Sequence, residues 1–402
     1  MAEVKRRIHS LDALRALAML MGVFLHAMIA YEETPGTIWI DDPNYQSIYY
    51  DYLYVWIHAF RMPLFFVVAG YFARFLIKRV GVITFLRKRL ERIVIPFLAS
   101  IILIRPLSAI PFEWYRVLNT ASYETFSLIE VLLQSVSWNG LYHLWFLYYL
   151  IWFYIASVTV WFFAERFIAK AYWQFNFGVK NAFLLTLTTF GLLFFFYDLG
   201  VEPWTGLKLK AGQFLYYGIY FGFGIGLHYC DNLNVSMKST IIYMMVGTIA
   251  SIFTVSEVFF LPATYKQLFL AVSTVSLTFG MFGVFQHLFS RENKALRYIS
   301  DSAYWLYLVH LPLVCGIQLM LIDTGIPGLV KFLMASVIPV IIALVSYEYL
   351  VRYSLVGRIL HGRREKAIFL EENNNADKSN NNLVFLSAEN NRSIPKPFNS
   401  NQ

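Results

Sequence analysis

Long apolar runs, separated by short polar stretches, recur along nearly the whole chain. A helix of about twenty residues crosses the roughly 30 Å hydrocarbon core of a membrane, so runs of this length predict membrane-spanning helices. We expect such segments at residues 11–31, 52–77, 93–111, 141–164, 182–198, 212–228, 239–256, 265–288, 300–321 and 329–351. The predicted fold class is therefore all-α: a polytopic integral membrane helix bundle of about ten transmembrane helices.

The composition supports this fold class and excludes a soluble globular protein. Of the 402 residues, 58% are hydrophobic and 14% are charged, whereas soluble domains have roughly 45–50% and about 25%. After residue 352 the chain becomes rich in asparagine, which predicts disorder. We expect a cytoplasmic N-terminus at residues 1–10, a membrane domain at 11–351 and a cytoplasmic tail at 352–402.

The net charge of +8 would suit a nucleic-acid partner, but the positions of the basic residues explain it differently. If the N-terminus is cytoplasmic, most of the 33 lysines and arginines fall on the inner side, whereas the outer loop 32–51 has none. This asymmetry follows the positive-inside rule, so we expect both termini in the cytoplasm and no nucleic-acid partner. Cys230 and Cys315 lack metal-ligand spacing, and no metal site is expected.

Ionisable residues inside the first apolar segment point to a functional site, because such residues are costly in lipid. Arg15 and His26 are eleven positions apart. At about 100° per residue this is three turns plus about 20°, so both are predicted to face one side, roughly 16 Å apart along the axis. Alternatively, Arg15 forms only an ion pair with Asp12 at the inner interface.

Four histidines from four predicted helices fall in the outer half of the membrane. His58 and Arg61 share a face of the second segment and reach about the depth of His26. His143 begins the fourth segment, and His310 lies in the outer half of the ninth. Each histidine has the alternative of a hydrogen-bonded residue without catalytic function, and His143 that of an interfacial one. A buried guanidinium such as Arg61 needs a partner or a water-filled cavity.

Basic residues also gather before the third segment. Arg89 and Arg92 are three positions apart, so they present two guanidiniums together, an arrangement that suits phosphate. The alternative is an ordinary positive-inside cluster that contacts anionic lipid. Near the inner end of the last segment, Glu348 is predicted to pair with Arg352, four residues later.

Several motifs resemble the membrane-bound acyltransferase-3 family. They are LDALRALA at residues 11–18 with His26, FRMPLFFVVAG at 60–70, FLRKRLERIVIPF at 85–97 and DSAYWLYLVHLP at 301–312. An Arg-x10-His pattern with a following Arg-x-x-Arg is specific to this family, and the resemblance spans residues 8 to about 352. Within the family the chain most resembles the glucans biosynthesis C group, through HLWFL at 143–147 and IHAFRMP at 57–63.

The resemblance implies a multi-pass enzyme of the bacterial inner membrane. Such an enzyme uses cytoplasmic acyl-CoA, here succinyl-CoA or acetyl-CoA, to acylate a hydroxyl of a periplasmic or cell-envelope glycan. Carried over by motif, Arg15 and His26 are the catalytic-channel pair, and Arg89 and Arg92 contact the CoA phosphates. The implied partners are the acyl-CoA donor, the glycan acceptor, membrane lipid and other glycan biosynthesis proteins, with no permanently bound cofactor.

Acyl transfer to an alcohol needs a base and a group that stabilises the oxyanion. We assign His26 as the base and Arg61 to the oxyanion or to an anionic acyl group, with His58 and His310 as further catalytic candidates. A covalent acyl-histidine route stays open. Two further alternatives stay open. The acceptor could be another glycan, such as lipopolysaccharide O-antigen, or the protein could belong to a different functional class, a transporter or flippase.

Sugar recognition is expected in the outer loops 32–51 and 112–140. Their aromatic residues either stack on sugars or anchor the membrane interface. These residues are Trp39, Tyr45, Tyr49, Tyr50, Trp114 and Tyr115.

Overall fold

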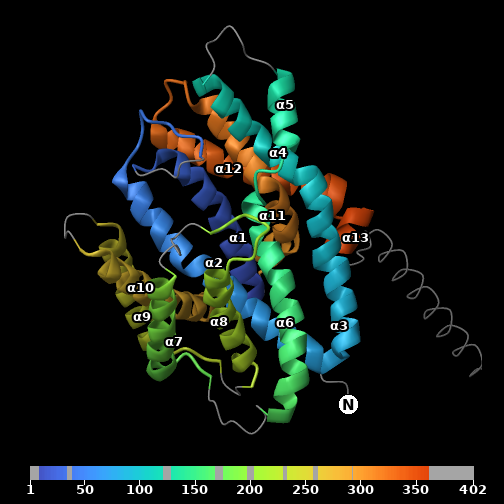
Figure 1. Ribbon diagram of the computed structural model, residues 1–402, viewed down its shortest axis with the longest axis vertical. Coiled ribbons are helices and arrows are strands. Elements are labelled where there is room, and N and C mark those ends of the chain that lie inside the picture. The colour runs from blue at the N-terminus through green and yellow to red at the C-terminus, as the bar shows by residue number, and fades with distance from the viewer. Residues whose placement is uncertain are drawn as a thin grey trace, which may run out of the picture.

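The computed structural model describes residues 9–33, 39–120, 128–167, 175–196, 203–229, 233–256, 261–291 and 293–361. Within these ranges the chain is all-helical and has no strand (Figure 1). The α-helices are α1 (His9–Met28), α2 (Ile48–Val80), α3 (Val82–Arg89), α4 (Ile95–Thr120), α5 (Leu128–Val136), α6 (Trp145–Phe167), α7 (Val179–Phe195), α8 (Ala211–Leu227), α9 (Met237–Val255), α10 (Ala263–Leu288), α11 (Lys294–Leu321), α12 (Gly328–Ser346) and α13 (Leu355–His361). Short 3-10 or π-helical turns are η1 (Ile29–Tyr31), η2 (Leu90–Val94), η4 (Tyr142–Leu144) and η5 (Tyr347–Val351).

The polytopic helical fold class is confirmed, since every apolar segment expected from the sequence coincides with a helix. Seven helical stretches of the described chain are long and apolar enough to cross a membrane. They are Ala13–Tyr31, Ile48–Val80, Val82–Asn119, Met237–Val255, Ala263–Leu288, Lys294–Leu321 and Gly328–Val351. The count of ten spans and the cytoplasmic side of the termini stay predictions. The expected N-terminal residues 1–8 and the tail beyond residue 361 lie outside the described residues.

One boundary differs clearly from the sequence expectation. The third segment was expected to end at residue 111, whereas α4 continues to Thr120 with Pro106 and Pro111 inside it. A proline lacks the backbone N–H and usually breaks a helix, but neighbouring helices and local adjustments allow prolines within membrane helices. Part of the expected outer stretch 112–140 is therefore helical, as α4 and then α5.

Helix α2 crosses the bundle next to α1 and α8, and it carries two of the residues singled out above (Figure 1). Small residues allow its close approach to α8. A Cβ at Gly70 would overlap the carbonyl oxygen of Phe221, and a Cβ at Gly224 would overlap that of Val67. Helix α1 also packs against α11, which in turn packs against α4 and α12. The histidines of α1, α2 and α11 are thereby brought to one region.

The loop after α1 is fixed to α12 by a buried ion pair. Lys331 is 0% exposed, and its Nζ lies 2.7 Å from Asp42 Oδ2. The same ammonium donates to the carbonyl oxygen of Ile322 at 2.9 Å and lies 4.5 Å from the ring centre of Tyr45. This pair holds the loop over the ends of α1 and α12. At the other end of α12, the predicted pair of Glu348 with Arg352 is confirmed, at 2.7 Å.

Candidate active site

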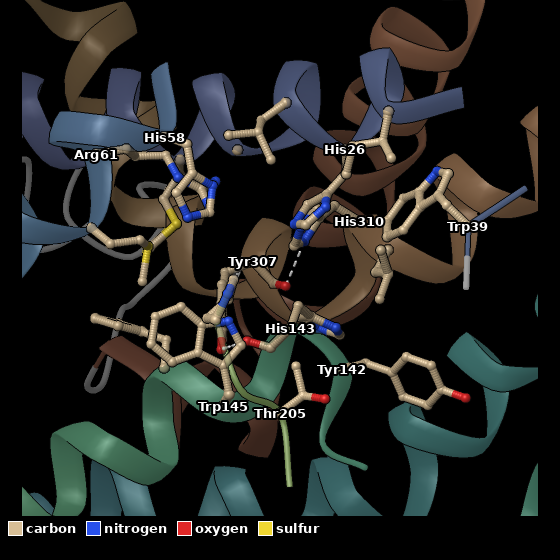
Figure 2. Close-up of a pocket in the computed structure, with 18 of the residues that line it drawn as sticks. His26, Trp39, His58, Arg61, Tyr142, His143, Trp145, Thr205, Tyr307 and His310 are labelled. Carbon is tan, nitrogen blue, oxygen red and sulfur yellow. Dashed lines mark hydrogen bonds between the residues drawn. The ribbon is translucent and has the colours of Figure 1, made fainter. Parts of the chain in front are cut away.

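A cavity of about 230 Å³ lies where α1, α2 and α11 meet the connections before α2, α6 and α8 (Figure 2). Five residues expected from the sequence line it together: His26, His58, Arg61, His143 and His310. Aromatic and apolar side chains form most of the remaining wall, among them Tyr54, Phe65, Trp145, Phe146 and Tyr307. A mostly apolar cavity with a few convergent polar groups is the usual form of a small-molecule site.

Three imidazoles lie around the centre of this cavity. The ring centres of His26 and His310 are 5.3 Å apart, and those of His143 and His310 are 5.0 Å apart. They come from α1, from the turn before α6 and from α11, as Figure 2 shows. The geometry therefore brings these three histidines together, and their place in the outer half of the membrane stays a prediction. Among the described residues, no group of three or more His, Cys, Asp or Glu side chains is arranged to hold a metal ion.

Hydrogen bonds to carbonyl oxygens select the tautomers of two of these rings. His310 Nδ1 lies 2.6 Å from the Tyr307 carbonyl oxygen, and His143 Nε2 lies 3.1 Å from that of Leu308. A carbonyl only accepts, so each of these nitrogens carries the proton. The neutral His310 ring then has its lone pair at Nε2, and His143 has its lone pair at Nδ1. Both rings can accept a proton without breaking these bonds.

His26 is held by groups from two other segments. The ring of Trp39 stacks on the imidazole, with 5.4 Å between ring centres and 10° between planes. Gln318, on α11, donates from Nε2 to the carbonyl oxygens of His26 and Ala27 at 3.1 and 3.0 Å, and it accepts from Trp39 Nε1 at 3.2 Å. Gln318 thus satisfies carbonyls at the end of α1, where helical partners are lacking, and connects that end to Trp39.

Arg61 and His58 occupy the α2 side of the cavity, away from Trp39 (Figure 2). Within the described ranges, Arg61 Nε and both ring nitrogens of buried His58 have no hydrogen-bond partner, and no ion pair to Arg61 is found. Room for the guanidinium comes from Gly22 on α1, where a Cβ would overlap Arg61 Nη1. A cationic group in this position is available to a ligand, since none of the described carboxylates neutralises it.

The other predicted site residues lie elsewhere. Arg15 is exposed on the first half of α1 and does not line the cavity, and the face that it is expected to share with His26 stays a prediction. Arg89 is half-buried, with its guanidinium carbon 4.6 Å from the ring centre of Tyr154. Arg92, on the π-helical turn η2, is exposed. None of these three arginines lines the cavity that holds the imidazoles.

Sequence reasoning missed several residues of this site. Gln318 and Tyr307 were not singled out, although a glutamine within an apolar membrane segment needs partners and is itself a signal. Asn139, Tyr142 and Thr205 also line the cavity, from connections whose course the sequence does not reveal. Trp39 was expected in an outer loop, but its stacking on His26 was not.

Comparison with known proteins decides the family. A model described as an acyltransferase domain, of the acyltransferase-3 type, matches residues 8–348, nearly the whole described chain. The chain belongs to the acyltransferase-3 family. The resemblance drawn from its motifs is confirmed, and the protein is a membrane acyltransferase of this family.

Curated relatives carry the name "Glucans biosynthesis protein C". The protein of that name from Salmonella heidelberg (strain SL476) is 24% identical over 392 residues, which cover 89% of this chain and 95% of the relative. Those from Salmonella paratyphi B and Salmonella enteritidis PT4 are each 23% identical over the same shares. No solved structure matches the chain.

Proposed function

We propose that this acyltransferase, in the bacterial inner membrane, moves an acyl group from cytoplasmic acyl-CoA to a hydroxyl of a periplasmic or cell-envelope glycan, with a glucan as the favoured acceptor. The observation that carries the proposal is the meeting of His26, His143 and His310 with Arg61 in one cavity. The family supplies acyl transfer, and the relatives' name supports a glucan acceptor. An imidazole suits proton transfer near neutral pH, which a hydroxyl nucleophile needs.

In the proposed reaction, His26 accepts the proton of the glycan hydroxyl as its oxygen attacks the thioester carbonyl carbon. The carbonyl oxygen becomes an oxyanion, which the guanidinium of Arg61 stabilises by charge and hydrogen bonding. The oxyanion then collapses, the carbon–sulfur bond breaks, and the CoA sulfur leaves and takes up a proton. His310, whose lone pair lies on Nε2 because Nδ1 is protonated and whose ring centre is 5.3 Å from that of His26, receives or returns that proton.

The donor is proposed to approach from the inner side. Arg89 and Arg92 would bind its phosphates there, since planar guanidiniums match phosphate oxygens. Arg15, at the same side of α1, is retained as a candidate for guiding the donor toward His26. His58, beside Arg61, would make a further polar contact with the acyl group.

The test is mass spectrometry of periplasmic glucans and lipopolysaccharide from cells that lack the gene and from cells complemented with variants. Wild type is expected to restore a succinyl or acetyl mass on one glycan, whereas His26→Ala is not. The control is His287→Ala, because His287 bonds to the Val235 carbonyl oxygen at 2.9 Å and does not line the cavity. The amount of each variant in the membrane fraction is measured as well, and activities are compared at equal amounts of protein.

Two results would contradict the proposal. Full glycan acylation by His26→Ala would remove His26 from the mechanism. Unchanged acyl content in every envelope glycan after deletion would overturn glycan acylation and favour substrate transport, which the same intramembrane histidines and arginine would also suit.

A further inference from the structure

The cavity wall opposite α1 is built by two connections between helices. Asn139 and Tyr142 come from the connection before α6, and Pro203 and Thr205 from the connection before α8. In Figure 2, Tyr142 and Thr205 lie across the cavity from α1. The mechanism proposed above uses none of these residues.

The backbone of this wall is held in an unusual conformation. Tyr142 has φ +49°, the single positive φ at a non-glycine position among the described residues, and Gly140 has φ +103°. A bulky side chain rarely adopts a positive φ, and such positions persist only where the surroundings fix them, often at ligand-binding sites. Here the Leu141 N–H donates to the Thr205 carbonyl oxygen at 2.7 Å, which joins the two connections.

A buried arginine fixes the same segment from the other side. Arg105, on α4, is 2% exposed and donates to the carbonyl oxygens of Ser135 at 2.8 Å and Gly140 at 3.2 Å. Its guanidinium carbon lies 5.7 Å from the ring centre of Tyr142. The Tyr142 ring also stacks on Phe112, at 5.5 Å and 9°. Residues 139–142 are therefore a preformed element, which directly precedes His143.

We propose that Asn139, Tyr142 and Thr205 form the acceptor subsite, which binds a neutral, hydroxyl-rich sugar unit beside the imidazoles; this deepens the proposed function and rests on it. The polar groups of this wall are the amide of Asn139 and the hydroxyls of Tyr142 and Thr205, and none of its lining residues is charged. Asn139 donates to Glu113 Oε1 at 2.9 Å and also hydrogen-bonds the Tyr142 side chain, which leaves its carbonyl oxygen to accept from a sugar hydroxyl. A neutral wall suits a sugar and offers nothing to the phosphates of CoA.

The experiment measures steady-state acyl transfer by the full chain in lipid nanodiscs, with succinyl-CoA or acetyl-CoA as donor and a glucan oligosaccharide as acceptor. For Asn139→Ala and Thr205→Val we expect the acceptor KM to rise about fivefold to tenfold, the loss of roughly one hydrogen bond. The donor KM should stay at its wild-type value, because these side chains are assigned to the acceptor. Thr205→Val keeps the side-chain shape and the backbone carbonyl that Leu141 uses, so folding should be preserved.

The matched control is Asn119→Ala, the same substitution at an exposed asparagine of α4 that bonds to the Tyr115 carbonyl oxygen and does not line the cavity. An unchanged acceptor KM in both variants, with active wild type, would overturn the subsite alone. A raised donor KM would assign the wall to the donor and also overturn it. Absence of transfer to the oligosaccharide by wild type would instead overturn the proposed function, and the subsite with it.

Discussion

Two cationic side chains of the bundle, one fully buried and one half-buried, have opposite surroundings. Lys331 is fully buried, and its ammonium contacts Asp42, the Ile322 carbonyl oxygen and the Tyr45 ring. Arg61 lines the cavity and, within the described ranges, has neither an ion pair nor a partner for Nε. Moving a charge out of water is costly unless it is paired. The paired cation fixes a loop, whereas the unpaired one is available for a ligand.

The contrast extends to the groups around each cation. Arg105, like Lys331, donates hydrogen bonds to carbonyl oxygens and thereby fixes the connection before α6. The imidazoles beside Arg61 instead keep at least one nitrogen each without a protein partner: Nδ1 of His26, Nδ1 of His143 and both nitrogens of His58. Unsatisfied imidazole nitrogens therefore gather at the cavity, although Arg105 Nη2 and Asp42 Oδ1, outside it, also have no partner among the described residues. Polar groups left unsatisfied in a buried position call for a functional explanation.

The largest effect is expected from breaking the ion pair. Lys331→Met leaves the Asp42 carboxylate buried and unpaired, which should cost about 3–5 kcal/mol of stability. The melting temperature in detergent, followed by intrinsic fluorescence, should fall clearly, while transfer per mole of folded protein persists. Lys331→Met combined with Asp42→Leu should recover most of the loss, because no lone charge remains. Lys238→Met, at an exposed position, is the control; a double variant as unstable as the single one would refute this explanation.

Arg61→Met should give the reverse result. None of the described carboxylates is left unpaired by it, so the melting temperature should not fall. The kcat should drop by roughly 10²–10³-fold, the usual effect of losing an oxyanion donor. Equal losses with succinyl-CoA and acetyl-CoA would assign Arg61 to the oxyanion, and a loss confined to succinyl-CoA would assign it to an anionic acyl group. A lower melting temperature with wild-type kcat would make Arg61 structural and end the contrast with Lys331.

The sequence predicts the helices and the histidine layer for the same reason. Hydropathy locates each segment, and the fixed rise of a helix gives the depth of each side chain. This placed His26, His58, His143 and His310 in one layer, where the structure brings them to one cavity. It does not tell which neighbours cover each end of α1: Arg15 is exposed and does not line the cavity, so its role with His26 stays a prediction.

Contacts between distant segments could not be derived in this way. Lys331 and Asp42 are 289 positions apart, and Gln318 and Trp39 are 279 apart. A single sequence carries no signal that pairs such positions, since hydropathy describes each segment alone. The strained Tyr142 is similar: Gly140 hints at a turn, but Arg105 and Thr205, which fix its course, are far along the chain.

The smallest expected effect tests how the loop after α1, which carries Trp39, contributes to the position of His26. Trp39→Phe keeps an aromatic ring on His26 but removes the N–H that Gln318 accepts. We expect kcat to fall roughly two- to tenfold, the loss of a single hydrogen bond, with donor and acceptor KM unchanged, because Trp39 orients the imidazole without binding substrate. Trp204→Phe is the matched control, since Trp204 Nε1 donates to the Lys208 carbonyl oxygen and does not line the cavity. A raised acceptor KM at constant kcat would show instead that Trp39 binds the sugar and does not only orient His26.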